Sequence, residues 1–360
     1  MWFSVVWVLA CTLACALVGC ASDSGVGGSG GSGGSVGAPG EGGAGGRGGG
    51  GAMPAPAIGC DPLVPTYCGF PYPNDYFTVS DESTVTGKRL ALPDVAMPVD
   101  TGNRVTAADA FNEMDGFSPG IAAMAHLTGA SVTGLATPLT IEDSLGDDSP
   151  TVIIDAETGE RVPHWVDRDE WVVEAKRRVE AEESRPDFEI PRELAELERE
   201  QALMLRPAIR LDDARRYIVA IRDVVDGAGT PVESSPEFLA LRDGAPGDDV
   251  IESRRAHFEG IFSTLAEAGI DREDLQLAWD FTTASKENTT SAMVHIRDDA
   301  FAKYPDGVPY TIDVIDDPME GMACRLEITF DMPLYTTFGE TGSVLNLGDD
   351  GLPEQNGTYP

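Results

Sequence analysis

Three stretches of the chain place apolar residues in the way that β-strands do. In residues 203–206 (LMLR) leucine recurs at every second position, until Pro207 interrupts the pattern. Residues 217–221 (YIVAI) are continuously apolar and rich in β-branched side chains, and turn-forming residues follow at 226–229 (DGAG). In residues 275–281 (LQLAWDF) large apolar side chains alternate with more polar ones. Strands with an apolar face need a second layer to cover it, so the pattern predicts a mainly β fold, a β-sandwich.

Other stretches predict further strands around this nucleus. Residues 152–154 and 162–166 flank a turn and are predicted to pair as a β-hairpin. Two more strand-like stretches lie at 310–315 and 325–330. The charge-dense stretch after the hairpin is predicted to be a partly helical surface insertion, with Pro191 in the first turn of a helix.

Two amphipathic helices are predicted to cover the strands. The first has Asp249 as its N-cap, Glu252 three residues later as in a capping box, and Gly269 as its end. Its apolar face comprises Phe258, Ile261, Phe262 and Leu265. The second helix is predicted over residues 290–304, and the side chains expected to face inward are Met293, Ile296, Ala300 and Tyr304.

The order of several short motifs resembles a known family. These motifs are FPYPNDYF (70–77), FNEMDGFSPG (111–120), LMLRPAIRL (203–211), RYIVAIRD (216–223), DGAGTPV (226–232) and FTTAS (281–285). Together they resemble the immunoglobulin-like unit in the N-terminal region of bacterial virulence-factor (extracellular) lipases, over roughly Cys60 to Lys286. The resemblance implies an immunoglobulin-like β-sandwich, and in that family an α/β-hydrolase domain follows downstream.

An apolar segment at the start of the chain ends in the sequence LVGC (17–20). It resembles a bacterial lipobox, so residues 1–19 are expected to be a lipoprotein signal peptide and Cys20 the site of lipidation. An ordinary signal peptide or an anchoring helix is the alternative, but the Gly/Ser-rich sequence directly after Cys20 favours cleavage. Neither Ala21 nor Ser22 is the aspartate that usually retains Gram-negative lipoproteins at the inner membrane, so we expect a lipid anchor at the outer membrane or cell surface.

The composition changes after the lipobox. Residues 20–59 are rich in Gly and Ser and have few large apolar side chains, so they cannot offset the entropy of ordering. We therefore predict a disordered tether there, with a span of roughly 35 Å. A β-sandwich region with helical insertions is expected over residues 60–330, and an irregular C-terminal tail over 331–360.

The chain has six cysteines: Cys11, Cys15, Cys20, Cys60, Cys68 and Cys324. The first two lie in the signal peptide, and Cys20 is expected to carry the lipid. Cys60 and Cys68 bracket a turn-rich stretch and are predicted to form a local disulfide in an oxidising compartment. A metal site there is the alternative, but no histidine lies nearby. Cys324 is expected to be a small buried hydrophobe.

The charge of the chain narrows the range of partners. A formal net charge of -36 repels phosphate backbones and anionic headgroups, so we expect no nucleic-acid partner and membrane contact only through Cys20. The carboxylates predict a solvated surface. Scattered calcium binding is the alternative, at DDSP (147–150) or GDDG (348–351), although neither matches an EF-hand loop. No cofactor or resident metal is predicted, and the body is expected to be a monomer.

One stretch matches a catalytic motif without meeting its requirements. GFSPG (116–120) fits G-x-S-x-G, in which the residue after the serine donates a backbone N–H to the oxyanion. Here that residue is Pro119, which has no N–H, and the stretch before Ser118 is not strand-like. The four histidines follow no local catalytic or metal-binding spacing: His126, His164, His257 and His295. No catalytic residue is therefore assigned.

The leading hypothesis is a lipid-anchored cell-envelope lipoprotein with a non-catalytic β module. The stretch after Phe330 is too short for an α/β-hydrolase domain, so we expect that this chain lacks it, through truncation or loss. The expected partners are such a hydrolase domain or a surface ligand. Two alternatives stay open: a lipid-ester hydrolase (esterase or lipase) with an unrecognised Ser/His/Asp site, and a surface adhesin or structural lipoprotein.

Overall fold

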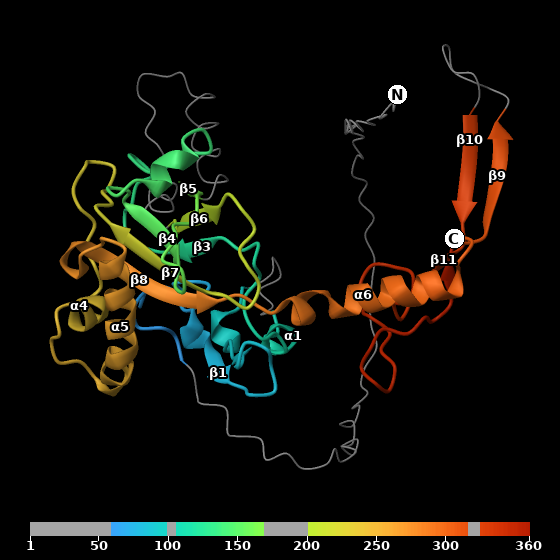
Figure 1. Ribbon diagram of the computed structural model, residues 1–360, viewed down its shortest axis with the longest axis horizontal. Coiled ribbons are helices and arrows are strands. Elements are labelled where there is room, and N and C mark those ends of the chain that lie inside the picture. The colour runs from blue at the N-terminus through green and yellow to red at the C-terminus, as the bar shows by residue number, and fades with distance from the viewer. Residues whose placement is uncertain (1–58, 99–105, 169–200, 316–324) are drawn as a thin grey trace, which may run out of the picture. The chain divides into compact units, whose positions relative to one another are not determined.

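The computed structural model describes residues 59–98, 106–168, 201–315 and 325–360, and over these residues the fold is mainly β (Figure 1). They contain twelve strands in small antiparallel sheets and four α-helices. The strands are β1 (Thr78–Ser80), β2 (Lys88–Leu90), β3 (Ala123–Ala125), β4 (Thr151–Asp155), β5 (His164–Asp167), β6 (Leu203–Pro207), β7 (Arg216–Arg222), β8 (Leu275–Thr282), β9 (Tyr310–Ile315), β10 (Arg325–Phe330), β11 (Met332–Pro333) and β12 (Thr358–Tyr359). The helices are α1 (Asp109–Asn112), α4 (Pro236–Arg242), α5 (Asp249–Glu267) and α6 (Lys286–Lys303).

Two three-stranded sheets contain the nucleus that the sequence predicts. Their strand orders are β3–β6–β5 and β4–β7–β8. In the second sheet Val219 lies opposite Trp279, and Tyr217 lies opposite Phe281, with the last two rings stacked 5.8 Å apart. All three predicted strands are therefore present, with β6 in one sheet and β7 and β8 in the other.

Strand β8 is buried on both faces, whereas its alternating sequence predicts one polar face. All eight of its residues are buried, and helices α4 and α5 pack against it (Figure 1). Its polar side chains bond to the protein instead of to water. The Gln276 amide accepts from Val224 N (2.8 Å) and donates to Val224 O and Val232 O. Hydrogen bonds from neighbouring segments thus compensate for burying the polar positions.

The predicted hairpin over residues 152–166 forms only beside its turn, where Ile154 bridges Arg161 in antiparallel register and Asp155 N donates to Glu160 O at 3.0 Å. The turn forms, with Gly159 N donating to Asp155 O at 2.8 Å, but beyond it β4 pairs with β7 and β5 pairs with β6. Ile153 O still accepts from Val162 N, so the chain crosses between the two sheets at this turn. Pro207 does end β6, as its last residue.

Helix α5 begins close to the predicted position and buries the predicted face. Asp248, not Asp249, is the N-cap, and its carboxylate accepts from Ile251 N at 2.9 Å. In a capping box Glu252 would accept from the backbone N–H of the N-cap residue. Here it accepts from Gly247 N, one residue before the N-cap, so the predicted capping box does not form. The buried apolar residues include Phe258, Ile261, Phe262 and Leu265.

Helix α6 departs further from its prediction. Ser285 caps it by accepting from Asn288 N at 3.1 Å, so the helix starts before residue 290. None of its residues is buried, and Met293, predicted to face inward, is 67% exposed. The helical spacing of these apolar residues predicts a buried face, whereas Ile296, Ala300 and Tyr304 are only partly buried.

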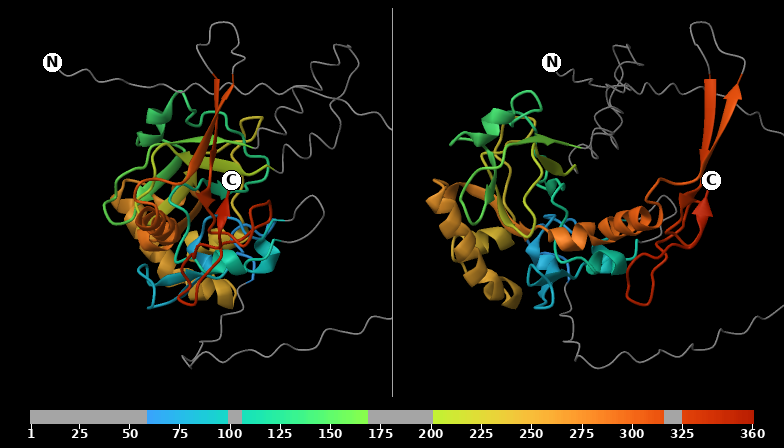
Figure 2. Two further views of the ribbon diagram at one scale, coloured as in Figure 1. Left: turned by 90° about the vertical axis from the view of Figure 1, so that its right-hand side faces the viewer. Right: turned by 45° about the vertical axis from the view of Figure 1, so that its right-hand side comes forward.

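The C-terminal residues form short β-structures. Strands β9 and β10 pair in antiparallel register, as two arrows side by side in both views of Figure 2. The tail predicted to be irregular contains the β11–β12 pair and two isolated bridges. In the part of the chain described, no helix has the length and apolarity to cross a membrane. The predicted signal peptide, tether, charged insertion and Cys324 lie outside the described residues.

Candidate functional site

Strand β8 is the place where motifs far apart in the sequence meet. The Asp75 carboxylate accepts from Thr282 N (2.8 Å) and from Thr282 Oγ1 (2.7 Å), and it pairs with Lys88 Nζ at 3.0 Å. Trp279 Nε1 donates to Pro73 O at 2.7 Å. The FPYPNDYF motif is therefore bonded directly to β8.

A second motif bonds to the end of the same strand. Phe117 N donates to Thr282 O at 2.9 Å, and Ala284 N donates to Phe117 O at 2.7 Å. The Asp115 carboxylate accepts from Ser285 N at 2.9 Å. We call this set of contacts the β8 junction; it comprises residues 73–75, 115–117 and 279–285.

The GFSPG motif contributes packing to the β8 junction. A Cβ on Gly116 would lie 2.6 Å from the carbonyl carbon of Thr283 and from Ala284 N, so this close approach requires glycine. Ser118 is exposed, and its Oγ accepts from Gly120 N at 3.3 Å. Pro119 O accepts from Leu211 N at 2.9 Å. The glycine of the catalytic-like motif is thus fixed by backbone contact with the FTTAS motif.

His164 is buried, with both ring nitrogens engaged. Nδ1 donates to Val162 O at 2.9 Å, so Nε2 accepts from Thr151 Oγ1, also at 2.9 Å. Burial lowers the pKa of His164, which keeps the ring neutral. The ring therefore acts as a connection between β4 and β5.

His257 forms a second polar contact to the sheet, from α5. Its Nε2 lies 2.8 Å from Asp280 Oδ1, and Arg216 Nε donates to Asp280 Oδ2 at 2.6 Å. Burial raises the pKa of Asp280, but His257 and Arg216 outweigh it, and the net pKa lies below its ordinary value. One turn away on α5, Ser253 donates its hydroxyl proton to Val250 O. The contacts of this His–Asp pair connect α5 to β7 and β8.

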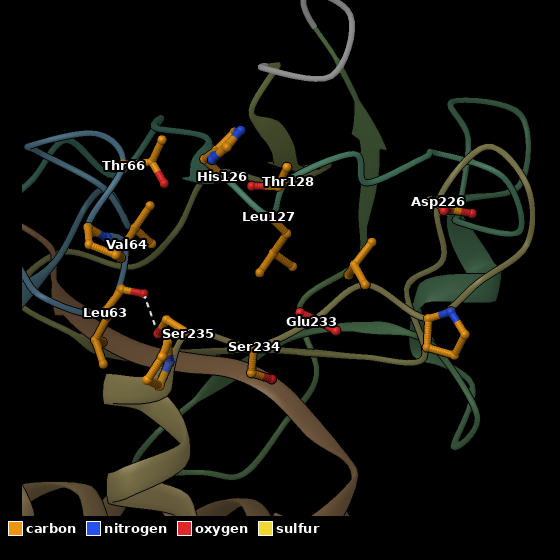
Figure 3. A pocket seen from close by; sticks show the side chains of 14 residues that line it. Leu63, Val64, Thr66, His126, Leu127, Thr128, Asp226, Glu233, Ser234 and Ser235 are labelled. Carbon is orange, nitrogen blue, oxygen red and sulfur yellow. Dashed lines mark hydrogen bonds between the residues drawn. The ribbon is translucent and has the colours of Figure 1, made fainter.

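A pocket of about 500 Å³ lies where three loops meet (Figure 3). One wall is the loop closed by the Cys60–Cys68 disulfide, and the others are residues 126–128 and 231–236. Ser235 Oγ donates to Leu63 O at 2.9 Å and joins two of the walls. The buried apolar lining residues are Leu63, Val64, Leu127 and Val232.

The disulfide loop is fixed by a buried ion pair. Asp61 is 0% exposed, and it accepts from Leu63 N (2.9 Å), Asn74 Nδ2 (2.6 Å) and Arg254 Nη1 (2.6 Å). The Arg254 guanidinium also lies 4.7 Å from the centre of the Tyr76 ring. Helix α5 thereby holds the wall of the pocket in place.

The polar groups of the pocket are mainly acidic and hydroxylic. Backbone N–H groups of Thr230 and Ala228 lower the pKa of Asp226, which is therefore ionised at neutral pH. Glu233, with Ser234 beside it, follows Asp226 on the same loop (Figure 3). Apolar walls with a few carboxylates suit a ligand that has an apolar body and a cationic or hydrogen-bond-donating end.

The described residues contain no group of three or more His, Cys, Asp or Glu side chains placed to hold a metal ion. A second pocket, of about 460 Å³, is lined by His295, Asp299 and the 348–354 turn, which includes the GDDG stretch. Lys303 Nζ pairs with Asp299 there at 2.8 Å. The carboxylate of Asp299 is thus used within the fold.

Of the site residues predicted from the sequence, the structure describes the disulfide cysteines but not the lipidation site. Cys60 and Cys68 are joined by a disulfide, and Cys20 lies outside the described residues. Sequence reasoning missed the Asp61–Arg254 pair, whose partners lie 193 positions apart. No local spacing signals a contact between residues so far apart.

No protein-family model matches the chain, and neither a curated protein nor a solved structure matches it.

Proposed function

We propose that this chain is a lipid-anchored lipoprotein of the cell envelope whose folded body is a non-catalytic β module. In this proposal Cys20 carries the lipid and residues 20–59 hold the body away from the membrane. The two three-stranded sheets are the layers of an immunoglobulin-like sandwich, similar to the N-terminal region of extracellular lipases. The pocket beside the disulfide loop is its ligand site.

The β8 junction is the observation that supports a non-catalytic role for the folded body. Three of the motifs behind the family resemblance satisfy one another's backbone and carboxylate groups there: FPYPNDYF, FNEMDGFSPG and FTTAS. Side chains and backbone used in this way stabilise the fold. The serine motif is then explained by packing, since its first glycine is the residue that the close approach requires.

The chemistry of the serine segment supports the same conclusion. An oxyanion hole needs an N–H from the residue after the nucleophile, and Pro119 has none. Removing one such donor typically costs about 10²–10³ in rate. Both ring nitrogens of His164 are occupied, by Val162 O and Thr151 Oγ1, so this histidine has no nitrogen left to activate a serine.

Ester hydrolysis tests this part. Purified protein and its Ser118→Ala variant would be assayed with p-nitrophenyl esters of short and long acyl chains. We expect both to hydrolyse each ester at the uncatalysed rate. Turnover by the wild type above the uncatalysed rate would establish the esterase alternative and overturn the proposal, and its loss in Ser118→Ala would identify Ser118 as the nucleophile.

Fatty-acid labelling tests the anchor. Stable anchoring usually needs more than one acyl chain, a requirement that a diacylated and N-acylated cysteine meets. The wild type should incorporate labelled palmitate and sediment with membranes, whereas Cys20→Ser should be unlabelled and soluble. Label retained by Cys20→Ser would refute the assignment of Cys20.

A further inference from the structure

The β9–β10 pair has one apolar and one polar face. Its register places Phe330 opposite Tyr310 and Ile328 opposite Ile312. Side chains alternate along a strand, and cross-strand partners share a face. The apolar face therefore contains three cross-strand pairs, Tyr310–Phe330, Ile312–Ile328 and Val314–Leu326. We call Tyr310, Ile312, Leu326, Ile328 and Phe330 the hairpin face. The opposite face includes Thr311, Glu327 and Thr329.

The hairpin face is open to solvent. Its five side chains are between 44% and 60% exposed. A two-stranded sheet alone is marginally stable in water, and contiguous exposed apolar surface marks an interaction site. In the described residues β9 and β10 pair only with each other, so the second layer must come from another surface.

Whereas the sequence alone predicts a monomer, we propose that the hairpin face packs against the same face of a second copy of this chain, related by a two-fold axis. The paired residues are large at one end of the face, where the Tyr310 and Phe330 rings lie 6.1 Å apart, and smaller at the other, where Leu326 pairs with Val314. A copy turned end for end places its aromatic end over this smaller end. Large groups then face small ones, which is the arrangement that fills a core, and a two-fold axis produces this arrangement.

The charges are compatible with this pairing. All five members of the hairpin face are uncharged, so their burial desolvates no ionised side chain. Glu327 lies on the opposite face and is exposed. Repulsion between two copies that each carry -36 is screened beyond about 8 Å at physiological ionic strength. An anionic membrane surface, by contrast, would place lipid phosphates directly against this acidic chain.

The area of the hairpin face limits how tightly two copies of the chain can associate. Six residues per strand span about 20 Å, and a stable interface buries about 800 Å² per partner, which a two-stranded face does not reach alone. The association should therefore be weak and depend on concentration. Anchoring two copies in one membrane, if the proposed function holds, would raise their local concentration.

Sedimentation equilibrium of the full chain tests the pairing. With Cys20→Ser in the background, so that the result does not depend on anchoring, the average mass should rise from monomer towards dimer between micromolar and near-millimolar protein. Ile328→Lys should weaken the association at least tenfold, because it buries a charge in the interface. Thr329→Lys is the matched control: it adds the same charge one residue away, on the polar face, and should retain the association.

Two results would overturn the proposal. The first is a wild type that stays monomeric across the whole concentration range. The second is an equal loss of association in the Ile328→Lys and Thr329→Lys variants. If circular dichroism shows that Ile328→Lys does not fold, Ile312→Lys replaces it. The wild-type concentration series tests the association without any variant.

Discussion

Single polar residues, buried with their partners, determine much of this fold. Asp61, His164 and Asp280 are all buried and all bonded. A buried carboxylate is tolerated only when cations and N–H groups replace its hydration. These residues should therefore be sensitive to loss of a partner.

The Asp61–Arg254 pair gives the first prediction. Arg254→Met should lower the free energy of unfolding by about 3–5 kcal/mol, because it leaves the Asp61 carboxylate buried without its cation. Urea denaturation measures this. Arg297→Met, in an exposed surface pair with Asp298, is the control and should cost much less. Equal losses in the two variants would contradict the importance of the buried pair.

His164 predicts a dependence of stability on pH. Its pKa in the folded protein is below the ordinary 6.5, so between the two values the unfolded chain binds more protons. The free energy of unfolding should therefore fall as pH drops below 6.5. In His164→Gln this part of the pH dependence should vanish, whatever the stability lost at neutral pH. Identical slopes in both proteins would show that His164 is not held neutral.

At the scale of elements, local periodicity predicts where the strands of the nucleus form, but it does not predict which strands pair. Strands β6, β7 and β8 and the apolar face of α5 follow from alternation and turn spacing, which each segment carries itself. The pairing of β4 and β5 with separate sheets depends on which distant strand supplies a better partner. Likewise, the second buried face of β8 depends on α5, a separate helix that ends at Glu267, before the strand begins at Leu275.

The disulfide loop is an element whose stability can be tested separately. Closing a loop of eight residues is worth about 2–3 kcal/mol in the chain-entropy model. A Cys60→Ser/Cys68→Ser variant should lose that amount and show faster hydrogen exchange in residues 60–68, while β7 and β8 stay protected. Loss of protection throughout β8 would mean that the loop is essential to the whole fold.

For the whole molecule, the candidate site was less predictable than the fold. The pocket combines residues near 64, 127 and 233, and its wall is held by Arg254 from a fourth segment. Each contributing stretch is an ordinary loop in the sequence, so only the folded chain identifies the site. The β8 junction is similar, because it joins motifs about 170 to 207 positions apart.

The most direct test of the account compares two residues of the GFSPG stretch, since the account holds that this stretch serves the fold. Gly116→Ala would place a methyl group against the backbone of Thr283 and Ala284, and it should lower the free energy of unfolding by about 1–3 kcal/mol. Ser118→Ala removes an exposed hydroxyl and should change it by less than about 0.5 kcal/mol. Global chemical denaturation of both variants gives the answer. A Gly116→Ala variant with the same free energy of unfolding as the wild type would contradict the role of the β8 junction.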